Sequence, residues 1–275
     1  MHIPLIKLHD GNAIPQLGYG LWQVSDEETE RVCVEAMKVG YRSIDCAQIY
    51  QNEMGLGRAI KSSGVKRDDL FITTKIWNSE QGYDNTLKSF DVSMKKLGLE
   101  KLDLLLIHWP SPHRDSYVET WKALIQLKKD KRVHSIGVSN FQTEHLQKIM
   151  DATSVAPVIN QIEVHPRFQQ KALRAFHEKN EIKTEAWSPL GQGQVIADPV
   201  IRKIADKHNR TPAQIILRWH LDKGLIAIPK SVTPSRIQEN FKVFDFSLDP
   251  SDSTHIEKMD DLKGRIGPNP DNAEF

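Results

Sequence analysis

The segment Leu102-Asp103-Leu104-Leu105-Leu106-Ile107-His108-Trp109-Pro110 is an almost uninterrupted apolar run that stops at a histidine, a tryptophan and a proline. Such a run is typical of a strand buried on both faces, as the strands of parallel sheets are. Pro110 lacks a backbone donor and restrains Trp109, so strand pairing should end there. His108 then lies where the buried strand meets solvent, a position at which a titratable ring needs a partner or a task.

One unit recurs on both sides of this strand: a short apolar strand, a loop, an amphipathic helix and a turn. It predicts eight strands, at residues 17–20, 43–45, 70–74, 102–107, 135–138, 158–162, 183–187 and 225–228. It predicts helices at residues 53–62, 83–97, 116–129, 143–151, 169–180, 198–208, 211–223 and 234–243. Alternation without a long linker favours one α/β domain over residues 1–275, a (β/α)8 TIM barrel. An open doubly wound sheet is disfavoured, because Gly18-Tyr19-Gly20-Leu21-Trp22-Gln23 lacks the last glycine of G-x-G-x-x-G.

Local signals mark the ends of several elements. The turn sequence Asp10-Gly11-Asn12 predicts an N-terminal β-hairpin that plugs one end of the barrel. Ser25-Asp26-Glu27-Glu28 predicts a capping box at the start of a further helix. Thr211-Pro212 and Thr233-Pro234 each predict an N-cap followed by proline at the first helical position. Residues 264–275 hold two prolines and little apolar material, so we expect a short C-terminal tail laid over one face.

The composition offers no dominant charge, since 37 Lys and Arg stand against 36 Asp and Glu and leave a formal net charge of +1. This balance favours a small-molecule partner over nucleic acid or a membrane surface. Cys33 and Cys46 are spaced for neither a zinc ribbon nor a CxxC motif, so we expect reduced thiols and no metal. No apolar run approaches bilayer-spanning length, and residues 1–20 do not resemble a signal peptide. We therefore expect a cytoplasmic protein, with a monomer as the default.

Polar residues occupy the carboxyl ends of the predicted strands, where the chemistry of such barrels takes place. Each has a structural alternative, such as a helix cap or a core aromatic, but together they predict a polar ring at one rim. The strand endings are Asp45, Lys75, His108, Ser139-Asn140, Gln161 with Glu163, Trp187-Ser188 and Lys230.

Four residues near this rim suit one reaction. Tyr50 lies in a loop that must return over the strand end at Asp45. A free phenol has a pKa near ~10, and the ammonium of Lys75, held in place by Asp45, should lower it. The phenol can then give a proton to a carbonyl oxygen that His108 orients by a hydrogen bond. These residues predict carbonyl reduction or its reverse, for which a cofactor must supply the hydride.

A phosphate site is predicted where the last strand leads into the last helix. The segment Lys230-Ser231-Val232-Thr233-Pro234-Ser235-Arg236 brings two cations, hydroxyl groups and free amide donors to a helix N-terminus. A basic surface turn is the structural alternative. Trp187 could stack on a nicotinamide ring, and Ser139, Asn140 and Gln161 could hydrogen-bond its carboxamide.

Several short motifs occur in a fixed order along the chain. They are Gly40-Tyr41-Arg42-Ser43-Ile44-Asp45, Tyr50-Gln51-Asn52-Glu53, Ile72-Thr73-Thr74-Lys75, Leu106-Ile107-His108-Trp109-Pro110, Ile136-Gly137-Val138-Ser139-Asn140-Phe141, Asn160-Gln161-Ile162-Glu163 and Ile228-Pro229-Lys230-Ser231. In this order they make the chain resemble the aldo-keto reductases along nearly its whole length. It is most similar to the prokaryotic branch that contains the 2,5-diketo-D-gluconic acid reductases.

The resemblance implies a barrel that binds NADPH in an extended pose, without a Rossmann fold. It makes Tyr50 the proton donor, with Lys75 and Asp45 tuning it and His108 orienting the carbonyl. It implies substrates that are small carbonyl compounds: keto-sugar acids such as 2,5-diketo-D-gluconate, keto esters, aldehydes and methylglyoxal, reduced to alcohols. The resemblance implies cofactor contacts at Ser139, Asn140 and Gln161 for the carboxamide, Trp187 beneath the ring, Ser188 and Leu190 along the pyrophosphate, Lys230, Ser231 and Arg236 at the 2′-phosphate, Glu239 and Asn240 at the adenine, and also Val232. It implies substrate-pocket walls at Trp22, Ile49, Trp77 and Trp109, beside His108.

Two features differ from many members of that family. Trp187 replaces a tyrosine that stacks on the nicotinamide, and the C-terminal segment is short, which implies a more open pocket. Two other functions stay open at this point: a nucleotide-binding sensor or partner-binding barrel with vestigial reductase activity, and a metal-dependent hydrolase using His108 and His165. The presence of all four predicted catalytic residues argues against the sensor or partner-binding barrel. The lack of HxH and HExxH spacings opposes the second.

Overall fold

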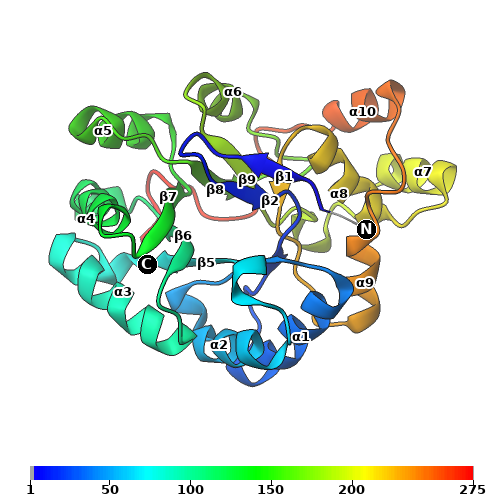
Figure 1. The fold of residues 1–275 in the computed structure, drawn as a ribbon. Helices are drawn as coiled ribbons and strands as arrows, with labels where there is room; N and C mark the ends of the chain where they lie inside the picture. Colours follow the sequence, from blue (N-terminus) through cyan, green and yellow to red (C-terminus); the bar gives the residue numbers. More distant parts are fainter. Residues whose placement is uncertain (1–2, 275) are drawn as a thin grey trace.

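Eight parallel strands form one sheet in the computed structural model, which describes residues 3–274 (Figure 1). The strands pair in chain order, and the sheet closes because Leu17 bridges Ala227 and the Gly20 amide donates to the Pro229 carbonyl. The (β/α)8 barrel predicted from the sequence is therefore confirmed. The strands are β3 (Tyr19–Gly20), β4 (Ser43–Asp45), β5 (Phe71–Ile76), β6 (Leu102–Ile107), β7 (Val133–Ser139), β8 (Ile159–Glu163), β9 (Lys183–Trp187) and β10 (Ile226–Ala227).

Helices surround the barrel and cover the outer face of its sheet (Figure 1). They are α1 (Asp26–Val39), α2 (Glu53–Ser62), α3 (Tyr83–Leu97), α4 (Tyr117–Lys129), α5 (Thr143–Thr153), α6 (Lys171–Lys179), α7 (Pro199–His208), α8 (Pro212–Asp222), α9 (Pro234–Phe241) and α10 (Pro250–Glu257). Short 3-10 turns are η1 (Gln48–Tyr50), η2 (Arg67–Asp69), η3 (Asn78–Glu80), η4 (Pro112–Arg114) and η5 (Gly191–Gly193). Over residues 3–274, no helix combines the length and the apolarity that crossing a bilayer would require.

β6 is buried along its whole length, as its apolar sequence predicted. Its one charged residue, Asp103, is tolerated because its carboxylate accepts hydrogen bonds from the amide of Ile72 at 2.8 Å and from Arg67 Nη2 at 2.6 Å. A buried carboxylate needs such partners to offset lost hydration. β6 is therefore an apolar core strand whose one acidic side chain has hydrogen-bond partners.

The two ends of the barrel are closed differently. The antiparallel hairpin β1 (Leu5–Lys7) and β2 (Ala13–Pro15) covers the amino end, where Ile14 joins an apolar cluster with residues that begin several barrel strands. The C-terminal tail crosses the carboxyl end, where the amides of Ile266 and Gly267 donate to the two oxygens of Glu163 at 2.7 and 2.9 Å. Both the plugging hairpin and the overlaid tail are as predicted.

Two helix caps differ from their predictions. Ser25 accepts from the Glu28 amide at 3.3 Å, but Glu28 binds Arg31 at 2.8 Å and does not complete the capping box. Thr233 occupies the N-cap position of α9 without a side-chain cap hydrogen bond, whereas Thr211 forms a full capping box at α8. The amides at the start of α9 are therefore less satisfied than the sequence suggested.

One helix was not predicted, and one strand end that bears on the site differs from its prediction. α10 was not predicted, because its sequence carries almost no amphipathic signal and the helix is held mainly by caps and ion pairs, such as Lys207 with Asp252 at 2.8 Å. β5 extends past Thr74 to Ile76, so Lys75 lies within the strand and not at its end. The long side chain of Lys75 therefore starts inside the barrel.

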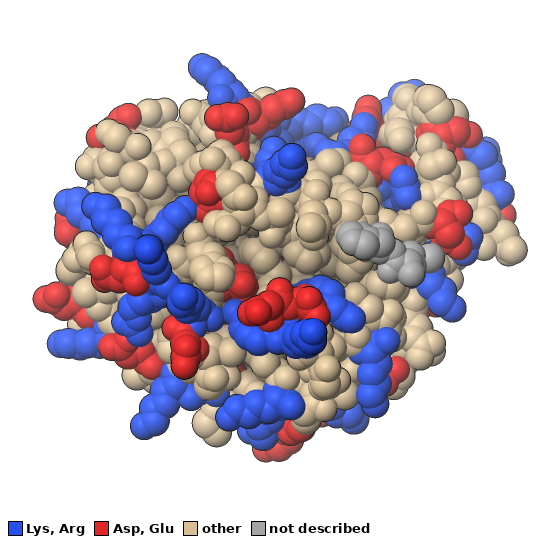
Figure 2. All heavy atoms as spheres, in the orientation of Figure 1, with Lys and Arg blue, Asp and Glu red and all other residues tan. Residues whose placement is uncertain are grey.

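The outer surface carries both charge signs. On the face that Figure 2 shows, basic and acidic side chains are interspersed around a mostly uncharged centre. Cys33 and Cys46 are both buried and free.

Candidate active site

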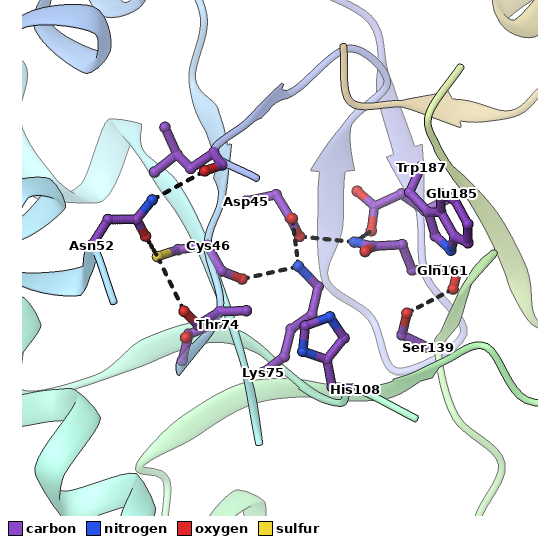
Figure 3. A network of polar contacts seen from close by, with 12 residues as sticks. Asp45, Cys46, Asn52, Thr74, Lys75, His108, Ser139, Gln161, Glu185 and Trp187 are labelled. Carbon is purple, nitrogen blue, oxygen red and sulfur yellow. Dashed lines mark hydrogen bonds and ion pairs between the residues drawn. The ribbon is translucent and has the colours of Figure 1, made fainter. Parts of the chain in front are cut away.

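The carboxyl end of the barrel gathers side chains that are far apart in the sequence. Asp45 ends β4, Tyr50 ends η1, Lys75 lies in β5 and His108 directly follows β6. Figure 3 shows Asp45, Lys75 and His108 directed into the same central space. The ring of Tyr50 lies 5.6 Å from that of His108, and Lys75 Nζ lies 5.1 Å from the Tyr50 ring centroid. The four predicted catalytic residues are thus brought together.

Lys75 and Asp45 form a fully enclosed ion pair. Lys75 is 0% exposed, and its Nζ donates to Asp45 Oδ1 at 2.5 Å and to the Cys46 carbonyl at 2.9 Å. Burial acts to lower the pKa of Lys75, but the charge and hydrogen bond of Asp45, together with Tyr50 and Glu185, outweigh burial and the pKa is raised. Lys75 is therefore a permanent cation at the centre of the site.

The pKa of Tyr50 differs from the sequence prediction. The pKa of its phenol was predicted to fall beside Lys75, but burial raises it to about 12 while the ammonium only moderates the rise. The prediction was wrong in net direction, because the sequence could not weigh desolvation against one nearby charge. The phenol therefore keeps its proton across the neutral range.

His108 is a neutral imidazole. Burial, assisted by the charge of Lys75, lowers its pKa well below the usual value. Its ring is 7% exposed and packs edge-on against Trp77 at 5.1 Å. Its Nδ1 is buried and finds no hydrogen-bond partner among residues 3–274. The ring is held by packing and not by a hydrogen-bonded carboxylate at Nδ1.

Gln161 connects Asp45 to an acid that the sequence analysis missed. Its Nε2 donates to Asp45 Oδ2 and to Glu185 Oε2, both at 2.8 Å (Figure 3). Glu185 is 1% exposed in β9, and burial, together with repulsion from Asp45, raises its pKa to about 8. A signal for it existed: strand alternation places Glu185 on the same side as Trp187, which was already assigned to the site.

The three predicted carboxamide ligands lie together, bonded to one another. Asn140 Nδ2 donates to the His108 carbonyl at 3.0 Å and to Ser139 Oγ at 3.1 Å, and its Oδ1 accepts from Trp187 Nε1 at 2.8 Å. Ser139 Oγ donates to the carbonyl of Gln161 at 2.8 Å. Asn140 has a φ of 64°, and such strained backbone concentrates at functional sites.

Trp187 is restrained by the tail as well as by Asn140. A Cβ added to Gly267 would lie 2.5 Å from the Trp187 ring, so only glycine permits this approach. Ser188, the next residue, has a φ of 46°, which turns the chain sharply after β9 towards Leu190. The aromatic predicted to stack on the cofactor is thus clamped from two directions.

The predicted phosphate segment is exposed at the start of α9. Neither Lys230 nor Arg236 forms an ion pair with any residue between 3 and 274. Ser231 Oγ accepts from the Thr233 amide at 3.1 Å, and Val232 is half-buried between them. Two uncompensated cations thus lie beside a helix N-terminus that has no side-chain cap, an arrangement suited to a dianionic phosphate.

The predicted adenine contacts lie one turn further along α9. Arg236, Glu239 and Asn240 share one helix face by their spacing. Glu239 accepts from Thr211 Oγ1 at 2.7 Å, which links it to the start of α8.

The predicted pocket walls follow the first strands of the barrel. Trp22 is 43% exposed and Ile49 is 40% exposed, whereas Trp109 is 8% exposed. Trp77 is partly buried against His108. Large apolar side chains that stay exposed next to buried titratable groups are typical of a binding site for small molecules.

The metal-hydrolase alternative finds no support in the arrangement of the histidines. His165 Nε2 lies 3.0 Å from Glu163 Oε1, whose carboxylate also holds the tail, while His108 faces Tyr50 and Trp77. Within the described part of the chain, no three His, Cys, Asp or Glu side chains form a group that could hold a metal ion.

Comparisons with known proteins agree with this geometry. Methylglyoxal reductase DkgA of Escherichia coli is 54% identical over 269 residues, 97% of each chain. The crystal structure of Gox0644 in its apo form superposes with a TM-score of 0.97 at 55% identity, covering 100% of both chains. A variant of Gox0644, solved in complex with NADPH, also has a TM-score of 0.97, at 54% identity and 100% coverage of both chains. The model of the aldo/keto reductase family matches residues 16–261, so this chain, with its barrel and its rim of Tyr50, Lys75, Asp45 and His108, belongs to the aldo/keto reductase family.

Proposed function

We propose that this chain reduces small carbonyl compounds to alcohols with NADPH, and that Tyr50 donates the proton. The observation that carries the proposal is the enclosed Lys75–Asp45 pair at 2.5 Å, next to the Tyr50 ring and the neutral His108. The relatives named as methylglyoxal reductases and the NADPH complex of Gox0644 support it.

The residues present fit NADPH. Lys230 and Arg236 are exposed cations beside the uncapped start of α9, where a 2′-phosphate would find two charges and free amides. Ser188 and Leu190 would follow the pyrophosphate, with Ser231, Val232, Glu239 and Asn240 on the adenosine side. Trp187 would lie beneath the nicotinamide, and Ser139, Asn140 and Gln161 would exchange some of their mutual hydrogen bonds for its carboxamide. When bound, the reduced nicotinamide supplies the hydride.

Tyr50 is the proton donor because its proton is always present and its conjugate base is stabilised. With a pKa of about 12, the phenol is protonated throughout the neutral range. As the carbonyl oxygen gains charge it becomes more basic than phenolate, so the proton moves from the Tyr50 hydroxyl to that oxygen. The ammonium of Lys75, 5.1 Å from the ring centroid, then balances the phenolate.

His108 orients the carbonyl without taking a charge. Its Nδ1 is buried and unpartnered within residues 3–274, and a bare lone pair there costs less than an orphaned N–H donor. The favoured tautomer therefore carries its hydrogen on Nε2, which is free to donate to the carbonyl oxygen.

The proposed substrates are keto-sugar acids, keto esters, aldehydes and dicarbonyls such as methylglyoxal. Trp22, Ile49, Trp77 and Trp109 would wall the pocket. The exposure of Trp22 and Ile49 supports an open pocket that selects loosely. We also propose that the protein acts as a cytoplasmic monomer, without a nucleic-acid or membrane partner.

Tyr50→Phe tests the proposal. The variant should bind NADPH, followed by tryptophan fluorescence, but should lose roughly two to four orders of magnitude in the rate of methylglyoxal reduction. Tyr83→Phe is the matched control, since Tyr83 is an exposed tyrosine at the start of α3 and should keep the wild-type rate. Retention of the rate in Tyr50→Phe would refute the mechanism. NADPH binding by the wild type without turnover of any carbonyl would favour a nucleotide sensor instead.

A further inference from the structure

Glu185 is a fully buried acid with no part in the mechanism above. It lies in β9, is 1% exposed, and accepts a hydrogen bond from Gln161 Nε2 at 2.8 Å. An acid in the middle of a barrel loses its hydration and is retained at a considerable energetic cost. Such a residue is a candidate for a task in the site that it faces.

Glu185 and Asp45 together determine how the Gln161 amide is turned. An amide nitrogen has two hydrogens, and here one is donated to Asp45 Oδ2 and the other to Glu185 Oε2, both at 2.8 Å. Turning the amide by half a rotation would break both hydrogen bonds and set its oxygen against the Asp45 carboxylate, which can only accept. The side-chain oxygen of Gln161 is therefore fixed as a free acceptor on the side away from both acids.

Removal of Glu185 alone would release this restraint. Asp45 also binds Lys75 and would still accept one hydrogen from Gln161. One remaining hydrogen bond, to Asp45, holds the amide less firmly, and it leaves the second hydrogen buried without an acceptor. The orientation of the Gln161 amide thus depends on Glu185 as its second acceptor.

We propose that Glu185 is a positioning residue for the cofactor: it holds the Gln161 amide so that its oxygen accepts a hydrogen bond from the amino group of the nicotinamide carboxamide. The inference rests on the proposed function and deepens it, because it assigns the orientation of the nicotinamide to a particular acid. Neither Ser139 nor Asn140 can hold the Gln161 amide in place of Glu185. Ser139 is oriented by its hydrogen bond to the Gln161 carbonyl, and Asn140 by its bonds to His108 and Trp187.

Glu185 also adds a titratable group to the charge balance of the site. The ionisable side chains that act on it are Asp45 and Lys75, and Lys75 in turn faces Tyr50. Burial and Asp45 raise the pKa of Glu185 to about 8, so the acid is largely neutral at pH 7. Its ionisation above pH 8 would place a second negative charge near Lys75 and disfavour the phenolate of Tyr50. Reduction should therefore slow on the alkaline side.

The test compares NADPH with its reduced 3-acetylpyridine analogue, which carries a methyl group where the carboxamide has its amino group. Dissociation constants are measured by tryptophan fluorescence, so that no turnover is needed. The wild type should prefer NADPH by about tenfold, which is ~1.4 kcal/mol. Glu185→Leu should reduce this preference to less than about threefold, because Gln161 is no longer fixed. Glu185→Gln should keep the preference, because the glutamine oxygen accepts the same hydrogen bond.

Glu53→Gln is the matched control. Glu53 is another acid at 1% exposure, it accepts from Thr74 Oγ1 at 2.7 Å in the same way, and it lies outside the rim in α2. It should keep the wild-type preference. A wild-type preference in folded Glu185→Leu, checked by circular dichroism, would overturn the proposal.

A second variant covers the case in which Glu185→Leu does not fold. Glu185→Asp keeps the acid but shortens its side chain by one methylene group, which takes its oxygens out of reach of Gln161 Nε2, now 2.8 Å from Glu185 Oε2. The preference for NADPH should again fall below about threefold, and a wild-type preference in this variant would contradict the proposal. Failure of the proposed function is distinguishable, because it would appear as a wild type that neither binds NADPH nor reduces any carbonyl.

Discussion

Replacing Lys75 with methionine removes the ammonium from the centre of the site and keeps a side chain of similar length. Lys75 is 0% exposed and forms its ion pair with Asp45 at 2.5 Å, so solvent cannot replace the lost charge. The variant therefore isolates the contribution of that cation to proton transfer from Tyr50.

The size of the effect follows from the distance between Lys75 Nζ and the centroid of the Tyr50 ring. At 5.1 Å and an effective dielectric constant of about 20, the Lys75 ammonium stabilises a full negative charge on Tyr50 by about 3 kcal/mol. Loss of that stabilisation in the transition state should slow reduction by roughly two hundredfold. The pKa of Tyr50, already raised to about 12, should rise further because its main cationic neighbour is gone.

The stability of the variant changes for a separate reason. Lys75→Met leaves the carboxylate of Asp45 buried with Gln161 as a partner, and breaking a buried pair in this way costs about 3–5 kcal/mol of unfolding free energy. The double variant Asp45→Asn with Lys75→Met removes both charges. It should recover most of the stability but none of the rate.

The assay is NADPH oxidation at saturating NADPH and methylglyoxal, with urea unfolding measured on the same preparations. Lys96→Met is the control, because Lys96 is 41% exposed in α3 and its ammonium lies 3.9 Å from the buried carboxylate of Glu53, outside the rim, so it should leave the rate unchanged. If folded Lys75→Met retained a rate within about fivefold of the wild type, the electrostatic account of Tyr50 would be refuted.

Three further outcomes are expected. Arg236→Ala should raise KM for NADPH much more than for NADH, since only NADPH carries the 2′-phosphate, and equal increases would exclude Arg236 as its ligand. Burial lowers the pKa of His220 to about 4, below the ordinary 6.5. The unfolded chain therefore binds more protons below pH 6.5, and urea titrations should show wild-type stability falling from pH 6.5 to 4, less so in His220→Gln. Gly267→Val should displace Trp187, since even a Cβ would lie 2.5 Å from the ring, and weaken NADPH binding as followed by fluorescence; unchanged binding would deny that the tail positions Trp187.

Much of the fold could be predicted because its signals are local. β6 was predicted with its observed bounds, Leu102–Ile107, because an apolar run ended by proline has few other structures open to it. α2 and α3 were also predicted residue for residue. α10 was missed because caps and ion pairs with α7 hold it, and these partners are distant in the sequence.

From the residues alone it could be predicted that strand and helix alternate, that Asp45 and His108 come at the carboxyl ends of strands, and that Lys75 lies near a third such end. That is enough to gather them, because parallel strands of a closed barrel end at one rim. The raised pKa of Tyr50, the burial of Glu185 against Gln161 and the contact between Gly267 and Trp187 follow only from the folded chain. Each of these depends on how much solvent the whole fold excludes and on which charges and rings the neighbouring strands bring within a few ångströms, and neither quantity can be obtained from the residues of one segment.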